Sequence, residues 1–130
     1  MHASRLDSEG PEDEAPVVAL AADLLFASRI RATAAAGGVR LRLVRTVEEA
    51  LAVARGGAKR LILDLDLRNG DPIALLRTLR GDPVTAAIPV IAFVSHVRED
   101  RIAAARDAGA TRVLARSAFV RELSQLLAAD

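Results

Sequence analysis

The chain has 130 residues, enough for one domain that buries about two-thirds of its unfolded surface, but not for a second catalytic or DNA-binding domain. Its 18 basic and 17 acidic residues nearly cancel, and it has neither Tyr nor Trp, which argues against nucleic acid or an anionic membrane as a partner. The absence of cysteine excludes disulfides, thiolate catalysis and Cys-bound zinc. We expect a cytoplasmic protein, since no segment is typical of a signal peptide or a membrane span.

The first 15 residues are acidic and contain little that could be buried. They hold five acids and one Arg, which predicts a disordered tail over residues 1–15 and a folded domain over residues 16–130. The remaining body is basic, with 17 Lys and Arg against 12 Asp and Glu. The tail could therefore fold back on this surface or stay in solvent.

From residue 16 onward, short apolar runs alternate with helical patterns. The runs predict strands at 17–21, 39–45, 60–65, 90–94 and 112–115. The patterns predict helices at 23–36, from a capping box at Thr46 and Glu49 to residue 55, at 73–80, at about 98–108 and around 123–127. The second run alternates apolar residues with Arg40 and Arg42, as suits a half-exposed edge strand. Together these units predict an α/β fold, a five-stranded parallel sheet with helices on both faces.

The third predicted strand carries the most informative pattern of the chain. Its apolar residues lead into Asp64 and Asp66, and the turn over residues 68–72 follows. A strand that ends in a carboxylate places a nucleophile or metal ligand at the carboxyl edge of the sheet, where open α/β folds bind ligands.

This region resembles the receiver domains of bacterial two-component response regulators, and the resemblance extends over nearly all of residues 16–128. The matching segments are Leu61-Ile62-Leu63-Asp64-Leu65-Asp66-Leu67-Arg68-Asn69-Gly70-Asp71-Pro72, Ile88-Pro89-Val90-Ile91 and Asp107-Ala108-Gly109-Ala110. The resemblance implies a flavodoxin-like receiver fold with the strand order 2-1-3-4-5. It also implies that Asp64 is the phosphoacceptor, since Asp forms acyl phosphates.

The resemblance implies a Mg²⁺ site that is incomplete in this chain. Receivers hold the ion with an acidic pair after the first strand, the acceptor Asp and a backbone carbonyl two residues later. Here the pair reads Ala22-Asp23, which leaves Asp23, Asp64 and Asp66 as a weakened or absent metal site. The Asp66 side chain could replace the missing acid or simply face water.

The positions that neutralise the phosphate and relay the signal also depart from the family. Arg116 stands where receivers carry a Lys, and it could hold a phosphate or pair directly with Asp64. The hydroxyl position of the fourth strand is Val94, and Ser95 could replace it only if the strand has already ended. The position of the aromatic switch residue is Val113.

We therefore predict an atypical single-domain receiver, a pseudo-receiver that signals through protein–protein interaction, with phosphorylation at Asp64 weakened or lost. It is not expected to be an enzyme beyond its own phosphorylation and dephosphorylation. The expected partner is a histidine kinase or a downstream target, and a homodimer could form through the fourth helix, the fifth strand and the fifth helix. A basic face there, either a partner surface or merely solvated, would comprise Arg98, Arg101, Arg106, Arg112 and Arg121.

Two alternatives stay open. The first is a functional phosphorelay receiver, in which a histidine kinase phosphorylates Asp64 with Mg²⁺ and Arg116 replaces the Lys. The second is a phosphatase similar to haloacid dehalogenases, which also place Asp-x-Asp at a strand end. Those enzymes need a downstream Lys, whereas Lys59, the single lysine of this chain, lies upstream of Asp64.

Overall fold

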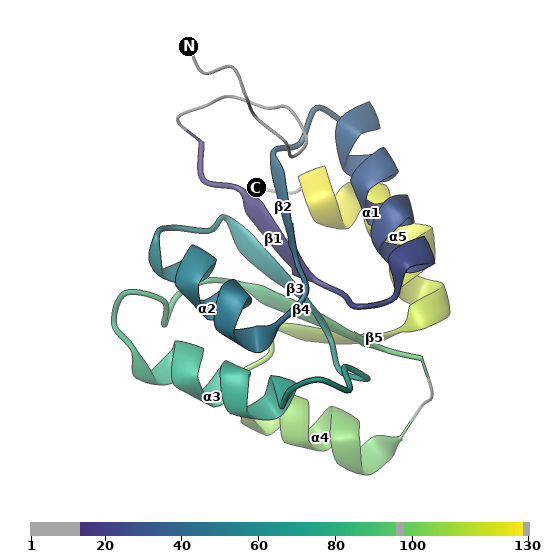
Figure 1. Ribbon diagram of the computed structural model, residues 1–130. Helices are drawn as coiled ribbons and strands as arrows, with labels where there is room; N and C mark the ends of the chain where they lie inside the picture. The colour runs from purple at the N-terminus through teal and green to yellow at the C-terminus, as the bar shows by residue number, and fades with distance from the viewer. Residues whose placement is uncertain (1–13, 96–97, 129–130) are drawn as a thin grey trace.

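The computed structural model describes residues 14–95 and 98–128, and these form five strands that alternate with five helices (Figure 1). Most of the predicted tail lies outside the described residues. The elements are β1 (Val17–Leu20), α1 (Leu24–Ala36), β2 (Leu41–Val44), α2 (Val47–Arg55), β3 (Arg60–Asp64), α3 (Pro72–Gly81), β4 (Val90–Val94), α4 (Glu99–Asp107), β5 (Arg112–Ala115) and α5 (Arg116–Ala128). Within the described ranges, no helix is long and apolar enough to cross a bilayer.

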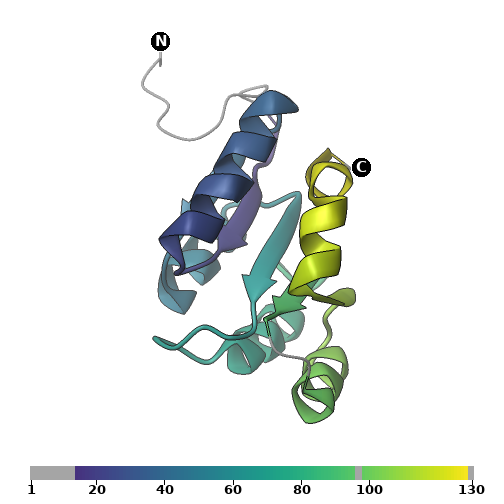
Figure 2. The same ribbon diagram turned by 90° about the vertical axis from the view of Figure 1, so that its right-hand side faces the viewer.

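The strands form one parallel sheet in the order β2-β1-β3-β4-β5, so the predicted fold and strand order are confirmed. Helices α1 and α5 cover one face, and α2, α3 and α4 cover the other (Figures 1 and 2). Strand β2 lies at an edge, as its alternating arginines predicted. It is shorter than the predicted 39–45, because its pairing with β1 starts at Leu41 and ends at Val44.

Each face of the sheet has its own apolar core. On the α1 and α5 side, three phenylalanines from different elements meet, with ring centroids 4.8 Å apart for Phe26 and Phe93 and 4.6 Å apart for Phe93 and Phe119. On the other side, aliphatic residues of β3 and β4 pack against leucines of α3 such as Leu76 and Leu79. Strands β1, β3 and β4 are buried throughout, which explains why their sequences are continuous apolar runs.

Helices α1, α2 and α3 start at capping side chains, whereas no side chain caps the start of α4. Asp71 accepts hydrogen bonds from two backbone N–H groups of the first turn of α3, and Pro72 follows it at the first helical position. At α2 one half of the predicted capping box is present, since the Thr46 hydroxyl accepts from the Glu49 N–H at 3.1 Å. The Glu49 carboxylate reaches back to the N–H of Arg45, one residue before the cap.

Candidate functional site

The loops at the carboxyl edge of the sheet enclose a pocket of about 420 Å³. It is lined by Ala22, Asp23, Asp64, Asp66, Leu67, Arg68, Asn69, Ser95 and Arg116. The strand register explains this gathering: Asp64 pairs with Phe93, and Val94 pairs with Ala115. Residues that follow these strand ends, such as Ser95 and Arg116, are therefore neighbours in space, so the structure brings together five of the six predicted site residues.

Asp64 is the last residue of β3 and is buried. Its Oδ1 accepts a hydrogen bond of 2.8 Å from the backbone N–H of Asp66. Burial is the largest influence on its pKa, which is raised above the usual value, and the negative charges of Asp66 and Asp23 act in the same direction. The Asp66 N–H and the more distant charge of Arg116 lower the pKa without reversing this effect. Asp64 is thus a desolvated carboxylate whose charge is only partly compensated.

Arg116 opens α5, and its guanidinium already has partners. Its Nη2 lies 3.3 Å from Asp23 Oδ2, and its Nη1 donates a hydrogen bond of 3.2 Å to the hydroxyl of Ser95. The guanidinium also stacks on Phe26, 4.1 Å from the ring centroid. In this structure Arg116 pairs with Asp23 and not directly with Asp64, and the ring and Asp23 hold the planar group toward the β1–α1 loop.

Asp23 uses both of its carboxylate oxygens within the protein. Oδ1 caps α1 by accepting from the N–H groups of Leu25 and Phe26, at 3.0 and 3.2 Å. Oδ2 faces Arg116. The hydrogen bond from Phe26, followed by the one from Arg116, lowers the pKa of Asp23 below its usual value. The carboxylate therefore stays ionised, with its oxygens directed at other protein groups.

The end of β4 places Val94 and Ser95 in different surroundings. Strand β4 ends at Val94, whose side chain is fully buried in the core on the α2, α3 and α4 side. Val94 cannot reach the pocket. Ser95 comes after the strand end, which is the condition under which the sequence allowed it to replace the missing hydroxyl. Its Oγ contacts Arg116, and its N–H donates a 2.5 Å hydrogen bond to Asp66 Oδ2.

Asp66 connects two loops, a role that the sequence did not reveal. Its backbone N–H binds Asp64, while its carboxylate accepts from Ser95 beyond the next strand. Its side chain is half-buried and hydrogen-bonded within the protein. A series of hydrogen bonds thus runs from Asp23 through Arg116 and Ser95 to Asp66 and Asp64. It links all of the loops that line the pocket.

A second contact missed by sequence reasoning comes from α4. Arg101 donates from Nε to the backbone carbonyl of Leu65 at 2.8 Å, and its Nη2 contacts the same oxygen. The expected basic face is thus partly wrong, because Arg101 turns inward. Two further arginines of this face form ion pairs: Arg112 Nη1 lies 3.3 Å from Glu122 Oε1, and Arg98 Nη2 lies 3.6 Å from Asp100 Oδ2. Contacts such as that of Arg101, 36 residues from its partner, leave no local signal in the sequence.

The acidic residues of the pocket do not fit a complete Mg²⁺ site. Among the described residues, no group of three His, Cys, Asp or Glu side chains is placed to hold a metal ion. Asp23 and Asp66, the two candidate ligands beside Asp64, direct carboxylate oxygens at Arg116 and at the N–H of Ser95. Mg²⁺ demands several oxygens in near-octahedral geometry, and this arrangement offers them to other donors instead.

Solved structures of response regulators are similar to the chain over most of its length, although no protein-family model matches it. The phosphorylated cyanobacterial phytochrome response regulator RcpA has a TM-score of 0.74 at 22% identity, over 88% of this chain and 89% of its own. The receiver domain of a response regulator from Rhodospirillum rubrum has a TM-score of 0.73 at 23% identity, over 85% of this chain and 89% of its own. The Mn²⁺-bound form of the response regulator Rcp1 has a TM-score of 0.77 at 15% identity, over 90% of this chain and 97% of its own. The chain therefore has the fold of response regulator receiver domains.

Proposed function

We propose that this chain is a degenerate receiver that acts in signal transduction by binding a protein partner, with phosphoryl transfer to Asp64 weakened or lost. One observation carries the proposal. Arg116, which stands where a phosphate-neutralising cation is expected, is bound to Asp23 and Ser95 and stacked on Phe26. A phosphoryl group on Asp64 would have to draw this guanidinium away from three existing contacts.

The incomplete metal site supports the same conclusion. Divalent cations bind within this fold, as the Mn²⁺-bound Rcp1 illustrates for that protein. In this chain Ala22 supplies no carboxylate, and Asp23 is committed to a helix cap and to Arg116. Asp23 and Asp66, the acids beside Asp64, thus have donors within the protein, so we infer at most weak Mg²⁺ binding.

The partner surface that we propose comprises α4, β5 and α5. Strand β5 is the second edge of the sheet, and its residues are at least partly exposed. Half-buried apolar residues, among them Leu114 and Val120, lie beside charged ones on this side. A histidine kinase, a downstream target or a second copy of the chain in the cytoplasm are the partners that we propose for it.

A functional phosphorelay receiver is the second candidate, and a specific observation favours it. Asp64 stands at the end of β3 inside the pocket, next to the Ser95 hydroxyl and the loop of Asp66, and RcpA is a phosphorylated protein of the same fold. The phosphatase alternative has no such support. Lys59 precedes β3 and therefore lies at the opposite edge of the sheet from Asp64.

Intact-protein mass spectrometry after treatment with acetyl phosphate and Mg²⁺ separates the two candidates. We expect little or no labile phosphate adduct on the wild type and none on Asp64→Asn. Restoring the receiver residues with Ala22→Asp and Arg116→Lys should produce an adduct that disappears again when Asp64→Asn is added. A stoichiometric, Asp64-dependent adduct on the wild type would instead establish the functional phosphorelay receiver.

A further inference from the structure

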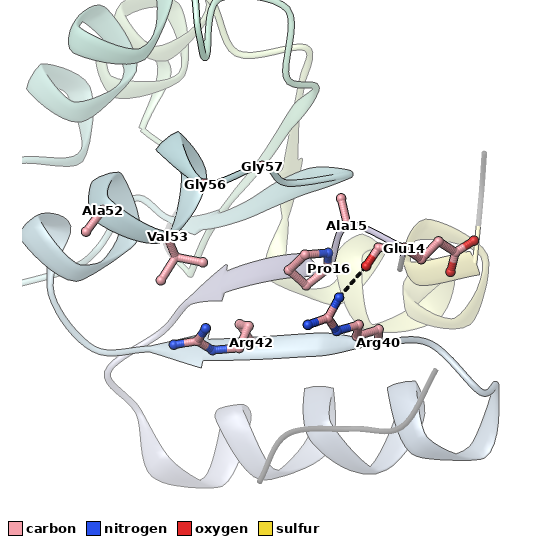
Figure 3. A pocket seen from close by; sticks show the side chains of 9 residues that line it. All are labelled: Glu14, Ala15, Pro16, Arg40, Arg42, Ala52, Val53, Gly56 and Gly57. Carbon is pink, nitrogen blue, oxygen red and sulfur yellow. Dashed lines mark hydrogen bonds between the residues drawn. The ribbon is translucent and has the colours of Figure 1, made fainter. Parts of the chain in front are cut away.

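A second pocket, of about 560 Å³, lies at the amino edge of the sheet (Figure 3). Asp64, the last residue of β3, lies at the opposite edge. Its walls come from three segments: the chain that enters β1, the start of β2 and the end of α2. The lining residues are Glu14, Ala15, Pro16, Arg40, Arg42, Ala52, Val53, Gly56 and Gly57. The receiver chemistry discussed above uses none of them.

The pocket has a cationic wall. Arg40 immediately precedes β2 and Arg42 lies within it, and Figure 3 shows both guanidinium groups at the pocket. Arg40 donates a hydrogen bond to the backbone carbonyl of Glu14 (Figure 3). Opposite them, Gly56 and Gly57 bring no side chains. The lining residues thus include two guanidinium groups and one carboxylate, so an anionic occupant complements this wall by charge.

An anionic segment of the same chain is attached to the rim of this pocket. Glu14 lines the wall, and the 13 residues before it include four acids, Asp7, Glu9, Glu12 and Asp13, against the one Arg5. Fully extended, 13 residues span up to about 45 Å, so the segment is long enough to reach every part of the pocket. Its attachment point gives it an effective concentration in the millimolar range, which a free anion of similar charge would need to match.

We propose that this pocket is the docking site of the acidic segment 1–13 of the same chain, held by Arg40 and Arg42. Docking places acidic residues beside the outer edge of β2, and it hides two basic side chains from other polyanions. The alternative is that Arg40 and Arg42 only protect an edge strand against pairing with another chain. That reading requires no association between the segment and the pocket.

Paramagnetic relaxation enhancement tests the docking directly. The chain has no cysteine, so Ser8→Cys provides a unique site for a nitroxide label. We expect strong broadening of the amide signals of Ala52, Gly56 and Gly57, and none at Asn69 or Gly70 at the opposite edge. In a segment of the same length neutralised by Asp7→Asn, Glu9→Gln, Glu12→Gln and Asp13→Asn, the broadening should fall several-fold. Salt at 1 M should have a similar effect on the acidic segment, because the Debye length shrinks to about 3 Å.

The pocket side is tested with the pair Arg40→Gln and Arg42→Gln in the labelled protein. We expect these changes to release the segment, whereas the matched pair Arg77→Gln and Arg106→Gln, exposed on α3 and α4, should leave the broadening unchanged. Amide spectra of the remaining residues verify that each variant is folded, and the neutralised segment tests the proposal without touching the domain. Equal broadening by the acidic and neutralised segments would show mere tethering, and it would overturn the proposal, as would the absence of broadening in both.

Discussion

Two regions of the sheet contrast with each other: its interior, where apolar side chains fill both faces, and its carboxyl edge, where charged side chains bond one another across loops. In the interior, Phe26, Phe93 and Phe119 contact through their rings, and each is almost fully buried. At the edge, Arg116 and Asp66 connect residues that are far apart in the sequence.

The difference teaches that the fold and the site depend on separate requirements. The interior needs apolar volume at the right period, and many residue combinations provide it. The edge would need particular donors and acceptors for phosphoryl chemistry, and here a guanidinium and a missing carboxylate alter the set. The polar groups of this edge find partners within the protein, so its residues can vary while the framework keeps its shape.

The largest effect on stability should come from the interior. Phe119→Ala removes a fully buried ring stacked at 4.6 Å on Phe93, and we expect a loss of about 3–5 kcal/mol in the free energy of unfolding. Urea denaturation measures it. Val84→Ala, at a side chain that is 62% exposed, serves as the control and should change stability by less than about 0.5 kcal/mol. Similar losses for both variants would contradict the picture of a dry core that fixes the fold.

A smaller loss in the free energy of unfolding is expected at the hydrogen bond between Arg101 of α4 and the backbone carbonyl of Leu65, just after β3. Arg101→Met leaves the carbonyl of Leu65 without its charged donor, which should cost about 1.5–3 kcal/mol in urea denaturation. Arg106→Met removes an exposed arginine from the same helix and should be nearly neutral. If both variants were equally stable, Arg101 would be another solvated arginine of α4, as the sequence suggested.

The smallest effect is a gain, and it depends on pH. Because the pKa of Asp64 is raised in the folded state, its ionisation destabilises the fold, and this penalty vanishes below the usual Asp value of 3.8. Asp64→Asn should therefore stabilise the protein by about 0.5–1 kcal/mol at pH 7, and the gain should shrink as the pH falls through the folded pKa toward 3.8. Exposed Asp107→Asn is the control. A gain that is independent of pH would exclude desolvation of Asp64 as its cause.

The fold could be predicted almost entirely from the sequence, because its signals are local. Continuous apolar runs gave β3 and β4, and capping residues such as Thr46 and Asp71 lie where α2 and α3 begin. The membership of the site was also predictable. The resemblance to receiver domains pointed to Asp23, Asp64, Asp66, Ser95 and Arg116, and these five residues line one pocket, since residues that follow parallel strands gather at one edge.

The pairings inside the site could not be predicted, because they depend on side-chain direction over long sequence separations. Arg116 could turn to Asp64 or to Asp23, which is 93 residues away, and the ring of Phe26 beneath the guanidinium accompanies the second arrangement. The choice between Val94 and Ser95 depended on where β4 ends, since one residue changes the face of a strand. Strand boundaries are weakly encoded, so both positions had to stay open.

A Mg²⁺ titration followed by amide NMR shifts tests most directly whether the carboxyl edge is satisfied by the protein itself. We expect that the amides of Asp66 and Ser95 in the wild type show no saturable shift at millimolar Mg²⁺. The matched double variant with Ala22→Asp and Arg116→Lys should give saturable shifts at the same residues, because a carboxylate is restored and Asp23 loses its guanidinium partner. Saturable Mg²⁺ binding by the wild type with the affinity of the double variant would contradict the claim that protein donors occupy the carboxylates of this edge. It would favour the functional phosphorelay receiver instead.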